Sequence, residues 1–295
     1  MFLFILHQNR LMNNFRIILI FLILSVAHSP LYPQPVKKSR GQAGYESSYE
    51  SKTLSPDSAN ILLPYNRYLA SAGTLIKFGP QTRESHAMDV AMSPDEKWLA
   101  VEERNEVYII SAKTRKIVAN LSSGKISGNS ATKNTYSGIC WIQEGARYKL
   151  WWGAVDGVHS YVLQAVWDNQ NLTPGDTLCF NAVSPARVAI PNEIIPEKEN
   201  GRLTLYVALN GNNQVVKTDV VSRERIWTAA VGVAPYGLVK ANGKIYVTNW
   251  AGSVPGPEET HVAGVPWGKA RIDPLTGATR EGTISVLDPL TGKVR

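Results

Sequence analysis

Short runs of β-branched and aromatic residues with near-alternating polarity recur along the chain, and Gly, Asn and Pro separate them every eight to twelve residues. The pattern is clearest between Leu203 and Trp250, where the pair Tyr206-Val207 returns as Tyr246-Val247. Runs of this length with a period of two predict strands, and their recurrence at a fixed spacing predicts an array of similar β-units. The sequence therefore predicts an all-β repeat fold.

Four repeats follow from this pattern. The first runs from His86 to about Leu121, the second is degenerate and lies around residues 137–163, the third covers Thr177 to Ala230, and the fourth begins at Val233. A lone strand, Gly73–Phe78, is expected to lead into the first repeat, and a polar loop is expected at Pro196–Gly201 within the third. In the fourth repeat, an insertion at residues 251–281 interrupts the strands and contains a second copy of the Asp-Pro-Leu-Thr-Gly turn. This copy predicts a hairpin inside the insertion.

Two kinds of turn punctuate the repeats. The first is Ser93-Pro94-Asp95-Glu96-Lys97, in which Pro sets φ at the second turn position. The second is Asp288–Gly292, and aligning the repeats on it places Arg115 and Arg223 where the last repeat has Gly292. Gly favours a positive φ, whereas Arg there costs on the order of 1 kcal/mol, so the first and third hairpins are expected to be looser.

The N-terminal segment has the layout of a secretory signal. Arg10 and Arg16 precede the apolar run Ile17–Ala27, and small, turn-forming residues follow it. We expect residues 1–33 to be a signal peptide or an uncleaved N-terminal anchor, with the true start at Met1 or Met12. Either alternative predicts an exported protein, periplasmic or extracellular. Residues 34–60 are polar and without periodicity, as a disordered linker would be, and the repeats occupy residues 61–295.

The net charge of +7 comes mostly from the leader. Residues 1–40 hold five basic residues and no acidic one, so the rest of the chain carries only +2. Such a balance gives no indication of nucleic-acid binding. Of the two cysteines, Cys140 and Cys179, an exported protein could form a disulfide, and the alternative is two buried thiols.

These residues resemble the YVTN-type β-propeller repeat. The features that carry the resemblance are the Ser93–Lys97 turn, the two Tyr-Val strands and the Asp288–Val294 turn. The resemblance implies a propeller of four-stranded antiparallel blades, of which about four are present. Propellers of this type usually close with seven blades, so the chain is expected to be part of a larger propeller; the alternative is a complete small propeller that is rich in insertions. The segment 232–252 and its insertion look most like the propeller half of exported bacterial proteins, in which a metal-dependent phosphoesterase of the alkaline phosphatase superfamily often follows.

Chemistry-bearing motifs are absent from the sequence. The histidines His86, His159 and His261 are dispersed, and no phosphate-binding loop, nucleophile elbow or carboxylate cluster is evident. The sequence therefore predicts no catalytic residue, no metal ligand and no cofactor. This weighs against a lactonase-like propeller enzyme, which would need metal ligands lining its channel.

Binding remains as the predicted function. The candidate surface consists of Asn210, Asn249, Trp250 and Trp267, which lie at loop edges in the best repeats. The structural alternative is that the Trp caps the core at a strand end and the Asn side chains support turns. We predict a non-catalytic interaction module whose partner is an unknown protein or small molecule at a propeller face, with membrane contact only through an uncleaved leader. The alternatives are the propeller portion of a periplasmic phosphoesterase and a lactonase-like enzyme.

Overall fold

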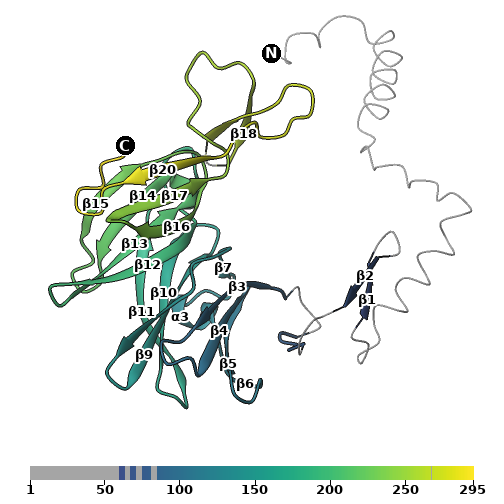
Figure 1. Cartoon of the computed structure of the whole chain (residues 1–295), viewed down its shortest axis with the longest axis vertical. Helices are drawn as coiled ribbons and strands as arrows, with labels where there is room; N and C mark the ends of the chain where they lie inside the picture. Colours follow the sequence, from purple (N-terminus) through teal and green to yellow (C-terminus); the bar gives the residue numbers. More distant parts are fainter. Residues whose placement is uncertain (1–59, 64–66, 71–74, 81–84, 267) are drawn as a thin grey trace, which may run out of the picture. The chain divides into compact units, whose positions relative to one another are not determined.

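A computed structural model describes residues 60–63, 67–70, 75–80, 85–266 and 268–295 (Figure 1). The chain divides into two units, Met1–Leu75 and Ile76–Arg295. Within the first unit, the described residues form an antiparallel hairpin of β1 (Asn60–Leu63) and β2 (Arg67–Ala70). The expected leader and almost all of the expected linker lie outside the described residues, so the predicted domain limits stay predictions.

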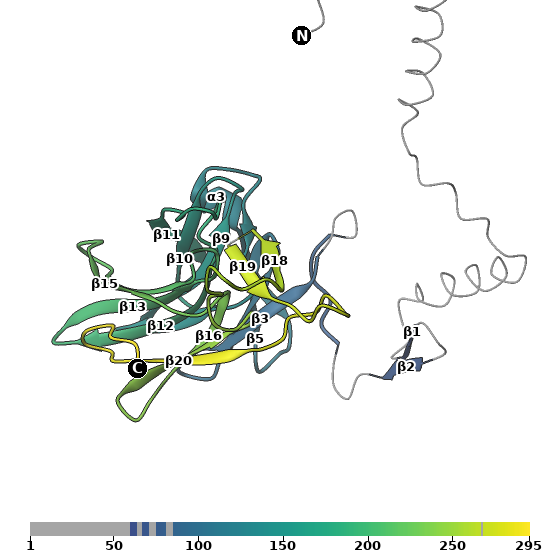
Figure 2. The same cartoon turned by 90° about the horizontal axis from the view of Figure 1, so that it is seen from above.

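The second unit is a four-bladed β-propeller, which confirms the predicted fold class (Figure 1; Figure 2 shows the same strands from above). Blade 1 has the spatial order β3 (Ala87–Met92), β4 (Trp98–Glu103), β5 (Glu106–Ser111) and β6 (Ile117–Ser122). Blade 2 has the order β11 (Leu172–Phe180), β10 (Ser160–Trp167) and β9 (Arg147–Val155), and both β7 (Lys133–Asn134) and β8 (Cys140–Glu144) pair with the remaining side of β9.

Blade 3 has the order β12 (Pro191–Glu199), β13 (Arg202–Leu209), β14 (Gln214–Asp219) and β15 (Arg225–Ala230). Blade 4 has β16 (Pro235–Ala241), β17 (Lys244–Asn249) and β20 (Thr283–Leu287), and a single bridge joins Leu287 to Val294 beyond β20. The insertion holds the hairpin of β18 (Val262–Val265) and β19 (Gly268–Arg271), so the predicted hairpin is present.

Three predicted boundaries are wrong. Within the predicted strand Gly73–Phe78, the described residues 75–78 belong to no strand. Ile76 and Phe78 instead pack beside Tyr108, on the face of blade 1 that points away from blade 2. The third repeat does not begin at Thr177, because β11 is the last strand of blade 2. The polar segment Pro196–Glu199 is the second half of β12 rather than a loop. Because β12 is an edge strand, it tolerates a proline that lacks an N–H donor.

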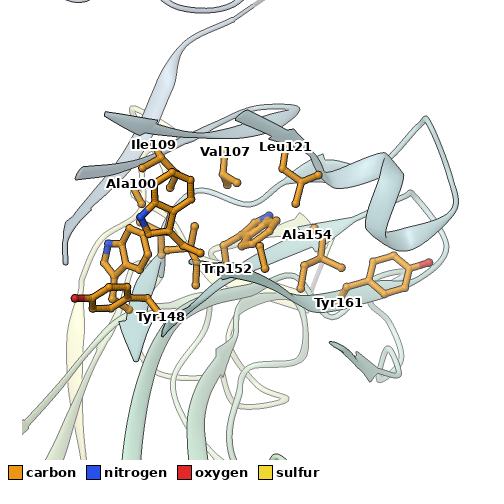
Figure 3. Packing of buried hydrophobic residues seen from close by; sticks show 14 residues of the cluster. Ala100, Val107, Ile109, Leu121, Tyr148, Trp152, Ala154 and Tyr161 are labelled. Carbon is orange, nitrogen blue, oxygen red and sulfur yellow. The ribbon is translucent and has the colours of Figure 1, made fainter. Parts of the chain in front are cut away.

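The hydrophobic core lies between the blades, in successive layers. Blades 1 and 2 enclose the fully buried Trp152, with Ala100, Val107 and Leu121 packed around it (Figure 3). The Trp152 indole donates to Ser123 Oγ at 3.0 Å and to Asn134 Oδ1 at 3.1 Å. Leu205 and Val207 help fill the layer between blades 2 and 3, and Ile245 belongs to the layer between blades 3 and 4. This alternation explains the polarity pattern of the strands, since successive residues face opposite neighbours.

The aligned turns share one backbone geometry. Arg115 and Arg223 have φ of 57° and 61°, close to the 70° of Gly292, as the alignment predicted. In blade 4, the Asp288 N–H bonds to the Lys293 carbonyl at 2.9 Å and the Gly292 N–H to the Asp288 carbonyl at 2.9 Å. The two arginines therefore occupy the left-handed region that a side chain disfavours.

Both cysteines are free thiols, Cys140 half-buried and Cys179 exposed, so the buried-thiol alternative describes Cys140 only in part and the disulfide is absent. Helix is scarce in the described part of the chain and includes α3 (Ser123–Ser127) and the 3-10 turn η2 (Asn210–Asn212). Among the residues described, no helix has both the length and the apolar character needed to cross a bilayer.

Candidate functional site

The first strands of the blades meet at the centre of the propeller. Strand β3 packs against β8, β8 against β12, and β12 against β16. Each first strand therefore contacts the first strand of a neighbouring blade as well as the next strand of its own sheet. Ligands of propellers commonly bind where such strands and their loops converge, so the residues at this centre are candidates for a binding site.

Three of the first strands break their pairing register at their beginning. The breaks lie between Ala87 and Asp89 on β3, between Pro191 and Ile194 on β12, and between Pro235 and Leu238 on β16. Such bulges turn a side chain away from the regular alternation and are frequent beside functional sites. Asp89, Glu193 and Tyr236 lie at these three breaks in register.

Strained backbone accompanies two of these breaks. Ile190 and Ala234, each directly before the proline that opens β12 or β16, have φ of 51° and 57°. A positive φ is a genuine outlier for a β-branched residue and persists only when surrounding contacts enforce it. Here the Ile190 carbonyl accepts the Asn210 N–H at 2.9 Å, and the Ala234 carbonyl accepts the Trp250 N–H at 3.1 Å.

Asp89, Glu102 and Glu193 form a group that we call the axial acidic cluster. Asp89 on β3 and Glu102 on β4 are directly opposed in the register, on the face that packs against blade 2. Asp89 Oδ2 accepts the Gly138 N–H at 2.8 Å and the Ile139 N–H at 3.3 Å, which ties blade 1 to blade 2. Like charges at opposed positions destabilise a sheet, so the pairing indicates a role beyond folding.

Two side chains at this centre are fully buried without a hydrogen-bond partner. Glu102 has 0% exposure, and neither carboxylate oxygen has a partner. Asn192, beside Glu193, also has 0% exposure, with both its Oδ1 and Nδ2 unpartnered. The absence of a side chain at Gly138 lets the backbone of blade 2 approach that of Asn192, because a Cβ there would clash with the Asn192 carbonyl oxygen. Buried polar groups are almost always satisfied, so these atoms need an explanation.

Burial and mutual repulsion shift the protonation of the cluster. Burial, followed by the charges of Asp89 and Glu193, raises the pKa of Glu102 well above its ordinary value. Burial and the charge of Asp89 raise the pKa of the half-buried Glu193 to about 7. The charged groups acting on both residues are carboxylates, so without a cationic partner the cluster relieves its repulsion by retaining protons.

Tyr236 and Trp250 form an aromatic pair next to the cluster. Their rings stack with centroids 4.1 Å apart and planes inclined by 14°. The Tyr236 hydroxyl donates to the Tyr136 carbonyl at 3.2 Å, two residues before the glycine that binds Asp89. Burial, together with the three carboxylates of the cluster, raises the pKa of Tyr236. Trp250 is 58% exposed, so the pair presents an aromatic surface to solvent.

The structure separates the four residues that the sequence analysis selected. Asn210 is buried and donates from Nδ2 to the Pro235 carbonyl at 3.1 Å, which joins blade 3 to blade 4. Asn249 is buried and donates to Thr283 and Ser285 within blade 4. Trp250 stands exposed at the position equivalent to Asn210. Trp267 lies outside the described residues.

The insertion is held together around Arg271 and lies against the start of blade 4. The Arg271 guanidinium donates to Glu259 Oε2 at 2.9 Å, to Glu281 Oε1 at 2.9 Å and to Ser253 Oγ at 2.6 Å. Ala270 of β19 packs in a small cluster with Ala234 and residues beside it. This contact places the insertion hairpin beside the strained residue that precedes β16.

The three residues of the axial acidic cluster were not among the sequence-predicted site residues. The three acids are far apart in the sequence, and blade packing brings them together. One signal was present: Glu102 continues the alternation of Trp98 and Ala100, whose side chains face the core between blades 1 and 2.

The cluster as it stands has no arrangement suited to coordinating a metal. Within the described part of the chain, no three His, Cys, Asp or Glu side chains converge closely enough to hold a metal ion. The arrangement can instead offer hydrogen-bond acceptors and negative charge next to an aromatic surface.

No family of known proteins matches the sequence, and no curated protein matches it either. Solved structures with a similar arrangement include a Bacteroides caccae protein of unknown function, with 10% identity and a TM-score of 0.41 over 68% of this chain and 61% of that one. A functionally unknown protein from Desulfotomaculum acetoxidans has 13% identity and a TM-score of 0.41, over 72% of this chain and 55% of that one.

A third similar structure is Myxococcus xanthus glutaminyl cyclase, with 12% identity and a TM-score of 0.36 over 71% of this chain and 68% of that one. The chain spans less than two thirds of the length of the Bacteroides caccae and Desulfotomaculum acetoxidans proteins, 61% and 55% respectively. At this level of similarity, none of the three indicates a function for this chain.

Proposed function

We propose that the chain is a non-catalytic binding module of an exported bacterial protein, and that it binds its ligand at the centre of the propeller beside Tyr236 and Trp250. One observation carries the proposal: three first strands break register where Asp89, Glu193 and Tyr236 stand, and Glu102 is buried there without a partner. Residues contributed by separate blades thus meet at one place.

The energetics of Glu102 support a binding role. Burying a carboxyl group without compensation costs several kcal/mol, and selection for stability alone would replace it by an apolar residue. Perturbed acids gather at functional sites because a ligand supplies the missing interaction. Buried Asn192 adds two more unsatisfied polar atoms at the same place.

Membership of the YVTN-type repeat group is part of this proposal. It is supported by Asp-based turns at Asp219 and Asp288, which hold equivalent repeat positions, and by the copy of this turn at Asp273 in the insertion. In each, the Asp Oδ1 accepts the backbone N–H groups two and three residues further on, at 2.8 to 3.0 Å. A shared local geometry at equivalent repeat positions is what a common repeat ancestry would produce.

Export is proposed from the leader pattern of residues 1–33. Expression in a bacterial host followed by cell fractionation and N-terminal sequencing tests it. We expect periplasmic or secreted protein whose N-terminus lies near residue 33. Cytoplasmic protein with an intact N-terminus would contradict export, and membrane-bound protein with an intact N-terminus would favour the anchor alternative.

A screen of neutral, anionic and cationic fragments by thermal shift on the full chain tests the binding function. Hits are then titrated against Trp250→Ala and against Val221→Ala, a control at an exposed apolar residue on the turn of blade 3. We expect Trp250→Ala to weaken binding and Val221→Ala to leave it unchanged. Hits that bind both variants equally would overturn the proposed site.

Hydrolysis assays separate this proposal from the two enzymatic alternatives. The phosphoesterase and lactonase alternatives predict turnover of p-nitrophenyl phosphate or of a simple lactone in the presence of divalent metal. The binding module predicts none above the rate without protein. Turnover that Glu102→Gln abolishes would replace the non-catalytic proposal by a catalytic one at the same cluster.

A further inference from the structure

The axial acidic cluster lacks a positive partner, and this deficit indicates the class of ligand. Glu102 has two unpartnered acceptor oxygens at 0% exposure, directly opposite Asp89. Asn192 contributes a third unpartnered acceptor, Oδ1. A ligand that satisfies these atoms must bring hydrogen-bond donors, and it must bring positive charge to offset the carboxylates.

The aromatic pair adds a second requirement. Aromatic faces attract cations and also bury apolar carbon. Tyr236 is linked to the cluster through the Tyr136–Gly138 segment, and Trp250 extends the aromatic surface from Tyr236 into solvent. A ligand reaching both features has a cationic end at the carboxylates and a carbon body against the rings.

We infer that the ligand is an organic ammonium ion, whose N–H groups donate to carboxylate oxygens of the axial acidic cluster and whose carbon body lies against Tyr236 and Trp250. This inference rests on the proposed binding function. A bare divalent cation fits less well, because it brings no carbon body for the rings. Within the described residues, the acidic side chains also do not converge on one coordination point.

Calorimetric titration of the full chain at pH 7 with phenethylamine tests the inference, because this amine is protonated at that pH. The matched ligand is 2-phenylethanol, which has a similar shape but no charge. We expect the amine to bind at least about tenfold more tightly than the alcohol, since charge-assisted hydrogen bonds are stronger than neutral ones. Calcium chloride is titrated separately as the divalent probe.

Substitutions within the axial acidic cluster test whether the amine binds there. Glu102→Gln and Glu193→Gln should each weaken amine binding at least about tenfold, because each removes a charged partner. Glu224→Gln, on the exposed turn of blade 3, should leave it unchanged. Thermal unfolding of each variant checks that the chain is folded. Glu193 is half-buried, so its variant stays informative if Glu102→Gln fails to fold.

Each outcome decides the inference. Equal binding of amine and alcohol, both lost in Trp250→Ala, would overturn the ammonium class but leave the binding function intact. Calcium binding that depends on Glu102, without amine binding, would assign the cluster to a metal instead. Absence of amine binding would overturn the inference, while the fragment screen judges the binding function independently.

Discussion

Asp89 and Glu102 face each other across β3 and β4, two carboxylates at directly opposed positions of one sheet. Glu193 from blade 3 adds its charge to theirs. The propeller thus holds three acids at its centre where apolar residues would stabilise it more. The ionisation of this group should therefore be visible in the stability of the whole chain.

Stability should fall as the pH rises towards neutrality. The pKa of Glu193 is about 7 in the folded chain and near 4.5 when unperturbed. Below pH 4.5 both states are protonated. Between the two values only the unfolded state releases its proton, so the free energy of unfolding falls by about 3 kcal/mol by pH 7. Urea unfolding from pH 4.5 to 8 measures this.

The matched variant for this test is Glu193→Gln, which should flatten the pH profile over the same range. Asp89, Glu102, Cys140 and Tyr236 face the same centre and remain unchanged in the variant. Glu102 has a pKa raised in the same direction, so part of the slope should survive. Stability that rises with pH in both proteins would contradict the assignment.

Two tryptophans should respond to truncation in opposite ways. Trp250→Ala should change the free energy of unfolding by less than about 0.5 kcal/mol, because the side chain is 58% exposed. Trp152→Ala should cost about 3–5 kcal/mol, because the side chain is fully buried between blades 1 and 2. Chemical unfolding of both variants makes the comparison. A large loss in Trp250→Ala would favour the capping role over recognition.

Glycine at position 223, where the backbone of the blade 3 turn is left-handed, should stabilise the folded chain. Arg223→Gly should be more stable than Arg223→Ala by about 1 kcal/mol, because φ is 61° and only glycine adopts it without cost. Both variants remove the same charge, so the difference isolates the backbone. Equal unfolding midpoints would show that the turn relaxes away from this φ in solution.

Arg271 should govern the order of the insertion without affecting the blades. Arg271→Met removes the hydrogen bonds to Glu259, Ser253 and Glu281, so amide exchange in β18 and β19 should accelerate at least about tenfold. The control is Lys269→Met on the same strand, where the side chain is exposed. Accelerated exchange throughout blade 4 would mean that the insertion and the blade unfold together.

The local parts of the fold were predictable from sequence. The first repeat, predicted from His86 to about Leu121, matches blade 1, and Arg115 and Arg223 have the positive φ that the alignment required. Both follow from interactions between near neighbours: alternation of polarity and the geometry of a short turn. The number of blades followed from repetition of the same local patterns.

The boundaries and the site depended on distant contacts. Pro196 predicted a loop, yet β12 is an edge strand, a property that only the assembled sheet defines. Glu102 looked like the polar end of a strand and is buried because blade 2 covers it. Asn210 and Trp250 looked alike as loop-edge residues, and only the neighbouring Pro235 carbonyl distinguishes the buried one.

The pairing of Asn249 with Thr283 determines how the segment between β17 and β20 can differ in length. The chain leaves β17 and re-enters β20 at adjacent positions, so the blade requires only that residues 250–282 close that short gap. The length of this segment can therefore vary without altering the pairing of β17 with β20. The propeller has a permissive position directly beside the aromatic pair, where new specificities can be grafted while the scaffold stays the same.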